Sequence, residues 1–209
     1  MNNVKIVSFD VEGTLVTTDY SYAIWFEAIP ERYAAANDLD FEKAKILVQE
    51  EYSKVGDQRL EWYDIHYWFS NLGLGFPEPV MARYSSRVEY YPEVKELLSL
   101  LGERYVLTVA SGSPREFLIH LLRDIETYFA RIFSSVSDYK RLKTPDFYRE
   151  MCDVLNVNPE QIVHVGDNWQ FDFLAPREVG IRTFYLDRKN QGKKTDTLSS
   201  LSELKAYLM

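Results

Sequence analysis

The sequence predicts an α/β protein in which helices cover both faces of a parallel sheet, with a helical unit inserted after the first strand. Two patterns indicate this fold. Short apolar, β-branched runs alternate with amphipathic stretches along the second half of the chain, which is typical of parallel strands joined by crossover helices. The interval 16–91, in contrast, contains helical patterns and no convincing pair of strands.

Five apolar runs are predicted to be strands: Val4–Phe9, Tyr105–Ala110, Arg131–Val136, Gln161–Val165 and Arg182–Leu186. Two of them contain Val-Leu-Thr-Val-Ala and Ile-Val-His-Val, the near-continuous apolar pattern of strands buried on both faces. Helix start signals lie between the runs. Ser113, Pro114 and Glu116 predict an N-cap, a first-turn proline and a capping box, and Thr144 before Pro145 predicts another helix start.

Residues 16–91 are predicted to form an α-helical domain of their own, while residues 1–15 and 92–209 form the α/β domain. The helical pieces expected in this insertion are Tyr20–Ala36, Phe41–Val55 and Asp57–Ser70. The insertion is rich in aromatic residues, namely Tyr20, Tyr22, Trp25, Phe26, Trp62, Tyr63, Tyr67, Trp68 and Phe69. We expect these rings chiefly to pack a small helical core, with a ligand-stacking wall, or a mixture of both, as the alternative.

Composition excludes several classes of function. The chain has 209 residues, 46% of them apolar, and 24 basic against 32 acidic residues give a net charge of −8. The absence of a basic stripe argues against nucleic-acid binding, and no apolar run approaches the roughly 18 residues that span a bilayer. A single cysteine, Cys152, cannot form an internal disulfide or a cysteine-rich zinc site. Because the amino terminus also lacks a signal-peptide pattern, we expect a cytoplasmic protein without a membrane or nucleic-acid partner.

Carboxylates are predicted to meet at the carboxyl edge of the sheet. The first strand is followed by Asp10-Val11-Glu12-Gly13-Thr14, and such a pair suits a nucleophile beside an acid/base group, although turn chemistry explains the segment equally well. The fourth run is followed by Asp167 and Asp172. Four carboxylates at one edge repel one another unless some are protonated or a hard divalent cation lies among them, and magnesium is the economical choice.

Two further positions at this edge suit an anion. Ser111 ends the second strand beside a helix amino terminus, whose free backbone donors and dipole favour a phosphate, although an isolated serine there more often satisfies backbone groups. Lys143 precedes the helix that starts at Pro145 and could hold an anion and the carboxylates together, although a surface lysine is the ordinary expectation.

The order of these segments resembles the four motifs of the haloacid dehalogenase superfamily of aspartate-nucleophile hydrolases. DVEGT matches the first motif, Ser111 the second, Lys143 the third and GDNWQFD the fourth. The resemblance covers residues 4–16 and 88–188 and implies a Rossmann-like core. The insertion falls where members of the superfamily carry a helical cap between their first two motifs.

The resemblance also implies phosphoryl transfer through an aspartyl-phosphate. Asp10 matches the nucleophile, and Glu12 stands where the phosphatases usually have a second aspartate as acid/base. The phosphate-binding positions are Ser111, Gly112 and Lys143, and the magnesium-binding positions are Asp10, Asp167, Asp172 and the backbone carbonyl of Glu12. Because Thr144 separates Lys143 from the proline, Lys140 remains a lesser candidate for the third motif.

We therefore expect a magnesium-dependent phosphatase of a small phosphorylated metabolite, monomeric or homodimeric. A phosphomutase or phosphotransferase of the same family is the runner-up, and a phospho-accepting signalling module or a non-catalytic binding protein is the alternative from another class. The remaining polar residues that could take part are expected mostly to be solvated or packed: Arg32, Arg59, Arg83, Arg87, His66, His120 and His164.

Overall fold

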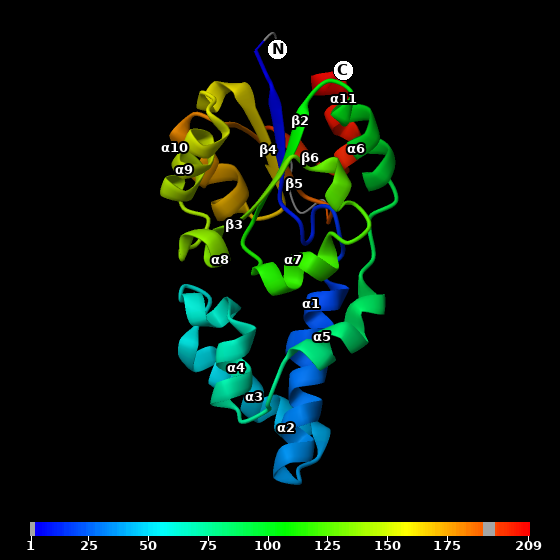
Figure 1. Cartoon of the computed structure of the whole chain (residues 1–209), viewed down its shortest axis with the longest axis vertical. Coiled ribbons are helices and arrows are strands. Elements are labelled where there is room, and N and C mark those ends of the chain that lie inside the picture. Colours follow the sequence, from blue (N-terminus) through cyan, green and yellow to red (C-terminus); the bar gives the residue numbers. More distant parts are fainter. Residues whose placement is uncertain (1–2, 190–194) are drawn as a thin grey trace.

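A parallel sheet forms the centre of the molecule, as expected, and it has six strands where five were predicted (Figure 1). A computed structural model describes residues 3–189 and 195–209, so residues 1–2 and 190–194 of the predicted α/β domain lie outside the described part. The strands are β1 (Ile6–Phe9), β2 (Val106–Ser111), β3 (Arg131–Ser134), β4 (Ile162–Gly166), β5 (Arg182–Leu186) and β6 (Thr197–Leu198), in the order β3-β2-β1-β4-β5-β6. The order reverses at β1, and in such sheets this switch point forms the ligand crevice.

Both faces of the sheet are buried. Ile6 belongs to a buried cluster that contains Phe147 and Ala175, whereas the next residue, Val7, belongs to a cluster that contains Leu97 and Leu208. The remaining helical elements beyond the insertion are α6 (Val94–Gly102), α7 (Arg115–Leu121), η4 (Glu126–Tyr128), α8 (Ser135–Tyr139), α9 (Pro145–Leu155), η5 (Pro159–Gln161), the π-helical η6 (Trp169–Leu174), α10 (Ala175–Val179), η7 (Leu201–Leu204) and α11 (Lys205–Leu208). Alternate side chains of β1 thus enter opposite layers, as the period of a strand requires.

Helices fill the insertion, which extends away from the sheet (Figure 1). They are α1 (Asp19–Ala23), the π-helical η1 (Ile24–Ala28), α2 (Ile29–Asn37), α3 (Phe41–Val55), η2 (Leu60–Tyr63), α4 (Ile65–Asn71), α5 (Glu78–Tyr84) and η3 (Ser85–Arg87). Its two connections run side by side: Val16 pairs with Tyr90 in an antiparallel bridge, and the Thr17 N–H donates to the Glu89 carbonyl at 2.8 Å. The insertion therefore joins the sheet through one paired hinge.

The structure corrects several expected boundaries. The third run ends as a strand at Ser134, because the Ser134 hydroxyl accepts from the Ser137 N–H and caps α8. The expected capping box at Ser113 is wrong, since Pro114 is the N-cap of α7 and no side chain bonds there. Within the expected helix 57–70, the Asp64 side chain accepts from two backbone N–H groups, so a new helix, α4, begins at Ile65.

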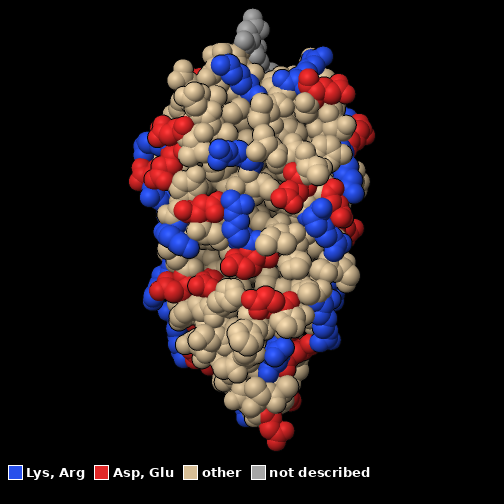
Figure 2. Space-filling view, in the orientation of Figure 1, with Lys and Arg blue, Asp and Glu red and all other residues tan. Residues whose placement is uncertain are grey.

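No helix in residues 3–189 or 195–209 is both long and apolar enough to cross a membrane. On the face drawn in Figure 2, acidic and basic side chains are interspersed and form no continuous basic patch. That face therefore lacks the positive surface that a nucleic-acid backbone needs.

Candidate active site

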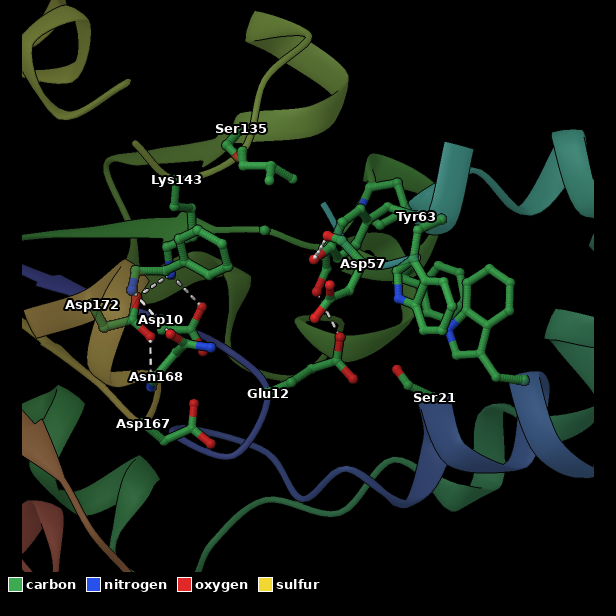
Figure 3. Close-up of a pocket in the computed structure, with 18 of the residues that line it drawn as sticks. Asp10, Glu12, Ser21, Asp57, Tyr63, Ser135, Lys143, Asp167, Asn168 and Asp172 are labelled. Atoms are coloured by element: carbon green, nitrogen blue, oxygen red, sulfur yellow. Dashed lines mark hydrogen bonds and ion pairs between the residues drawn. The ribbon is translucent and has the colours of Figure 1, made fainter. Parts of the chain in front are cut away.

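A cavity of about 350 Å³ lies at the carboxyl edge of the sheet, between the strands and the insertion. One end is polar and is lined by Asp10, Glu12, Lys143, Asp167, Asn168 and Asp172. The other end is aromatic and is lined by Trp25, Phe26, Tyr52, Trp62, Tyr63, Trp68 and Phe117. Figure 3 shows the two groups on opposite sides, with Glu12 between them.

An ammonium between two carboxylates forms the centre of the polar end. The Lys143 Nζ donates to Asp10 Oδ1 at 2.7 Å and also to Asp172 Oδ1. Lys143 is 4% exposed and Asp172 is 1% exposed. Asp10 directly follows β1, and its N–H donates to the carbonyl of Val165 in β4 at 2.9 Å, which fixes its place at the switch point. Lys143 thus contacts Asp10, which is 133 positions away in sequence, and Asp172, which is 29 positions away.

Two glycines leave room for the acidic side chains. Gly13 has a φ of +73°, and a Cβ at that position would overlap the Asp167 carboxylate. A Cβ at Gly166, the last residue of β4, would overlap Asp172. Both positions therefore require glycine so that the carboxylates can approach the backbone closely.

Three carboxylates at this end could hold a divalent cation. Oxygens of Asp10, Asp167 and Asp172 all lie within 4.8 Å of one another, and Lys143 is the only cationic side chain among the described cavity-lining residues. One ammonium against three carboxylates leaves negative charge that a cation would offset, and an all-oxygen donor set suits a hard ion. The residues present therefore fit the divalent cation that the sequence pattern predicted.

The crowding shifts the pKa values of these groups. Burial raises the pKa of Asp10 well above its usual range, and Asp172 and Asp167 raise it further against the opposing effect of Lys143. Loss of hydration and the nearby Asp172 raise the pKa of Asp167 to about 7. Burial alone would raise the pKa of Asp172, but Lys143 and His164 outweigh it and hold that pKa at about 2. Asp172 is therefore the permanent anion beside Lys143, and Asp10 and Asp167 are the carboxyls whose ionised forms a bound cation would favour.

Glu12 turns away from this carboxylate cluster. The Ser113 hydroxyl donates to Glu12 Oε2 at 2.6 Å, and the buried hydroxyl of Ser21, on α1, lies beside Glu12 in Figure 3. Burial raises the pKa of Glu12 above its ordinary value, and the hydrogen bond from Ser113 opposes that effect. The Glu12 side chain therefore does not join the oxygens of the possible metal site, and its placement suits proton transfer.

Of the predicted anion-binding positions, Gly112 and Lys143 line the cavity, whereas Ser111, at the end of β2, does not. Ser111 is 1% exposed, and its Oγ accepts from the Ser113 N–H at 3.0 Å, which leaves the hydroxyl proton free to donate. Gly112 lines the cavity, as does Ser135 at the start of α8. The Ser135 hydroxyl is fully buried and has no partner among the described residues. Sequence reasoning missed Ser135, although its place directly after a strand could have indicated it.

Sequence reasoning also missed a buried hydrogen-bond chain behind the cavity. His164, in β4, approaches Asp172 Oδ1 at 3.1 Å through Nε2 and the Ser8 hydroxyl at 3.0 Å through Nδ1. Because a carboxylate only accepts, Nε2 carries the proton and Nδ1 accepts from Ser8. The Tyr148 hydroxyl donates to the Phe171 carbonyl at 2.7 Å and packs beside this histidine. The one sequence signal for this hydrogen-bond chain was a single histidine within an apolar strand.

The lesser candidates lie elsewhere. Lys140 ends α8 with a φ of 52° and does not line the cavity. Cys152 is buried in α9, and burial raises its pKa to about 11, so it is an unreactive thiol. Three of the insertion's arginines pair with carboxylates, namely Arg59 with Glu61 at 2.6 Å, Arg83 with Glu31 at 4.0 Å and Arg87 with Glu27 at 3.3 Å.

Comparisons with known proteins give one matching family and several similar proteins. Residues 4–180 match the family described as haloacid dehalogenase-like hydrolase. The glyceraldehyde 3-phosphate phosphatase of Pyrococcus furiosus is 25% identical over 201 residues, covering 88% of this chain and 81% of the relative. A HAD phosphatase from Thermococcus onnurineus has a similar structure, with a TM-score of 0.86 at 21% identity over 98% of each chain. A 2-haloacid dehalogenase from Pseudomonas syringae has a TM-score of 0.70 at 20% identity over 98% of each chain.

Proposed function

The chain belongs to the haloacid dehalogenase-like hydrolases, and on that premise we propose that it is a magnesium-dependent phosphatase that hydrolyses a small phosphomonoester through an aspartyl-phosphate on Asp10. The observation that carries the proposal is the 2.7 Å contact between Lys143 and Asp10 within a carboxylate cluster at one end of the cavity. Phosphoryl transfer needs this combination of a positioned nucleophile and charge neutralisation. The phosphatase relative at 25% identity supports the same class.

In the first step, an Asp10 oxygen attacks phosphorus and the bond from phosphorus to the leaving oxygen breaks. Glu12 gives that oxygen a proton, and its raised pKa favours the protonated form that this step requires. Lys143 neutralises charge between Asp10 and the phosphoryl oxygens. Magnesium, held by Asp10 and Asp167 with Asp172 in support, would supply Lewis-acid stabilisation of the phosphoryl charge.

In the second step, water attacks the phosphorus of the aspartyl-phosphate and Glu12 accepts a proton from that water. The bond from phosphorus to Asp10 breaks, which restores the carboxylate and releases inorganic phosphate. The Ser111 hydroxyl and the Gly112 N–H are proposed to bind phosphoryl oxygens throughout, and the unpartnered Ser135 hydroxyl can join them.

Phosphate release from p-nitrophenyl phosphate, measured with magnesium and with a chelator, tests this function. Asp10→Asn is expected to lower kcat by at least about 10³-fold because the variant loses the covalent route. Asp153→Asn, which removes an exposed carboxylate on α9, is the matched control and should retain full activity. Full activity in Asp10→Asn, or release that persists in chelator, would falsify the proposal.

A phosphotransferase of the same family would form the same aspartyl-phosphate and pass the phosphoryl group to an alcohol instead of to water. Product analysis with added glycerol or glucose separates the two reactions. We expect inorganic phosphate to account for nearly all the product, because the proposal gives the second step to water.

A further inference from the structure

We propose that the aromatic end of the cavity selects a leaving group with one positive charge, so that the substrate is an O-phosphorylated amino alcohol, of which phosphocholine is the simplest quaternary form. This inference rests on the proposed phosphatase function and adds the chemical class of the alcohol. The overall reaction joins the phosphomonoester and water and yields the amino alcohol and inorganic phosphate, so it needs no other reactant.

The aromatic wall of the cavity offers ring surface and few polar donors. Tyr52 packs edge-on against Trp68 and Trp62, with ring centroids 4.6 and 5.8 Å apart. The Tyr52 hydroxyl donates to the Trp25 carbonyl at 3.0 Å, and the Trp68 indole N–H donates to the Trp62 carbonyl at 3.2 Å. Because the backbone already takes these donors, the wall is held rigid and meets a ligand through π-faces. Such faces attract a cation within about 6 Å, and tryptophan does so best.

The charged side chains near the rings also favour a positively charged ligand. Asp57, from the insertion, lines the cavity near Tyr63, and Glu12 lies between them and the carboxylate cluster (Figure 3). Lys143, the one cationic side chain among the described lining residues, is already bound to Asp10 and Asp172. A second anionic group on the substrate would therefore meet carboxylates and no free cation. A positively charged group would meet Asp57 and the rings.

The arginines that could have bound such an anion are held elsewhere. Arg59 pairs with Glu61 at 2.6 Å, and Arg87 pairs with Glu27 at 3.3 Å. No arginine lines the cavity in the described part of the chain. Among the described lining residues, Asp57 is therefore the one charged side chain at the aromatic end, and no arginine offsets it.

The size of the cavity favours a small amino alcohol over a nucleoside. A volume of about 350 Å³ is near the lower limit of small-molecule sites, which run from about 300 to 1,000 Å³. A nucleobase could stack on Trp62, but the Tyr52 hydroxyl and the Trp68 indole N–H already donate to backbone carbonyls and would leave polar groups on its edges without these donors. Unpaired polar groups in such a place cost binding free energy.

The test compares kcat/KM for four phosphomonoesters in magnesium buffer. They are phosphocholine, its neutral isostere with a tert-butyl group in place of trimethylammonium, phosphoglycolate, and adenosine monophosphate. We expect phosphocholine to exceed the isostere by about tenfold, because only the charge differs, and to exceed phosphoglycolate by more. Equal values for phosphocholine and the isostere, or a preference for the nucleotide or the acid, would overturn the inference.

Variants of Asp57 and Trp62 test whether the aromatic end causes the preference for phosphocholine. Asp57→Asn is expected to lower kcat/KM for phosphocholine about two- to fivefold and to leave the isostere within twofold, as suits a partly solvated charge. Glu50→Gln removes an exposed carboxylate from α3 in the same insertion and is the matched control. Trp62→Leu should remove most of the preference for phosphocholine, whereas Trp62→Phe should retain part of it because a ring remains.

Choline binding separates a failure of this inference from a failure of the phosphatase proposal. Three of the four tryptophans line the cavity, so quenching of intrinsic fluorescence reports choline binding without turnover. Choline binding that Trp62→Leu abolishes, together with no phosphate release from any ester, would sink the phosphatase proposal and keep the cation site. Phosphate release from all the esters without preference, and no choline binding, would sink the cation site and keep the phosphatase.

Discussion

Asp10 and Glu12 lie two residues apart and have different surroundings. Asp10 contacts the Lys143 ammonium, whereas Glu12 accepts a hydrogen bond from the Ser113 hydroxyl. The approach of Asp10 and Lys143 could be predicted, because Asp10 follows a strand and Lys143 precedes a helix at the same edge of the sheet. The direction of Glu12 could not, because it depends on a hydroxyl 101 positions away that sequence reasoning had assigned to a helix cap.

Replacing Glu12 tests its proposed acid/base role. Glu12→Gln cannot give or accept the proton, so we expect kcat for an alkyl phosphate to fall by about 10²- to 10⁴-fold. For p-nitrophenyl phosphate the first step should survive better, because a weakly basic leaving oxygen needs no proton, and aspartyl-phosphate should accumulate. Rapid quench with acid trapping measures that species. An equal loss on both substrates without an accumulated intermediate would indicate a merely structural role.

His164 gives stability a pH dependence of definite sign. Burial, assisted by Lys143 and opposed by Asp172, lowers the pKa of His164 in the fold below its ordinary value of 6.5. Below pH 6.5 the unfolded chain therefore takes up a proton that the folded chain does not, and stability falls as pH falls. His164→Gln should cost about 1–3 kcal/mol at pH 7.5 through lost hydrogen bonds.

That cost should shrink by up to about 1 kcal/mol at pH 5.5, because the variant has no imidazole to protonate on unfolding. Urea denaturation of both proteins at the two pH values gives the comparison. A cost that is the same at pH 5.5 and 7.5 would show that His164 does not contribute to acid destabilisation.

Regular elements could be predicted where local signals were complete. The bounds of α3 (Phe41–Val55) and β5 (Arg182–Leu186) match the expectation, because a capping aspartate starts the helix and β-branched or aromatic residues fill the strand. β6 was missed because two residues at a sheet edge carry no period. The π-helical turn Ile24–Ala28 was also missed, since apolar spacing does not separate it from an α-helix.

Arg188 contacts both connections of the insertion, near the hinge where Val16 pairs with Tyr90. Its guanidinium lies 3.5 Å from the ring centroid of Tyr91, donates to the carbonyls of Gly13 and Thr14 at 3.2 and 2.8 Å, and pairs with Glu93 at 2.9 Å. Arg188→Met removes all these contacts at once and should lower the free energy of unfolding by about 1–3 kcal/mol. Chemical denaturation measures that loss.

The same variant should change kcat and KM together, because the hinge sets the distance between the insertion and Asp10. Arg188→Lys is the informative companion. It keeps the charge but loses the planar fork and the stacking, so we expect it to recover less than half of the stability. Full recovery with lysine would mean that charge alone holds the hinge.

At the scale of the whole molecule, the site joins two surfaces that the chain builds separately. The strand order places Asp10, Lys143 and Asp172 at one edge, while the insertion supplies rings and Asp57 from a distance in sequence. The carboxylate cluster could be predicted because the carboxyl ends of parallel strands coincide. The arrangement of the rings around the cavity could not, because each ring's direction depends on packing between helices of the insertion.

Charge in the cluster should make stability depend on magnesium. The pKa of Asp167, raised from 3.8 to about 7 by lost hydration and by Asp172, means that its ionised form opposes folding. That cost is absent below pH 3.8, grows as pH rises from 3.8 to about 7 and is fully present above pH 7. In chelator at pH 8, Asp167→Asn should therefore melt slightly higher than the wild type, since Asp167 is exposed and water screens much of the repulsion. Added magnesium should raise the wild-type Tm with the logarithm of its concentration and leave Asp167→Asn unchanged, because the ion binds the folded state through that carboxylate. A variant that melts lower in chelator, or that gains as much from magnesium as the wild type, would place the ion elsewhere.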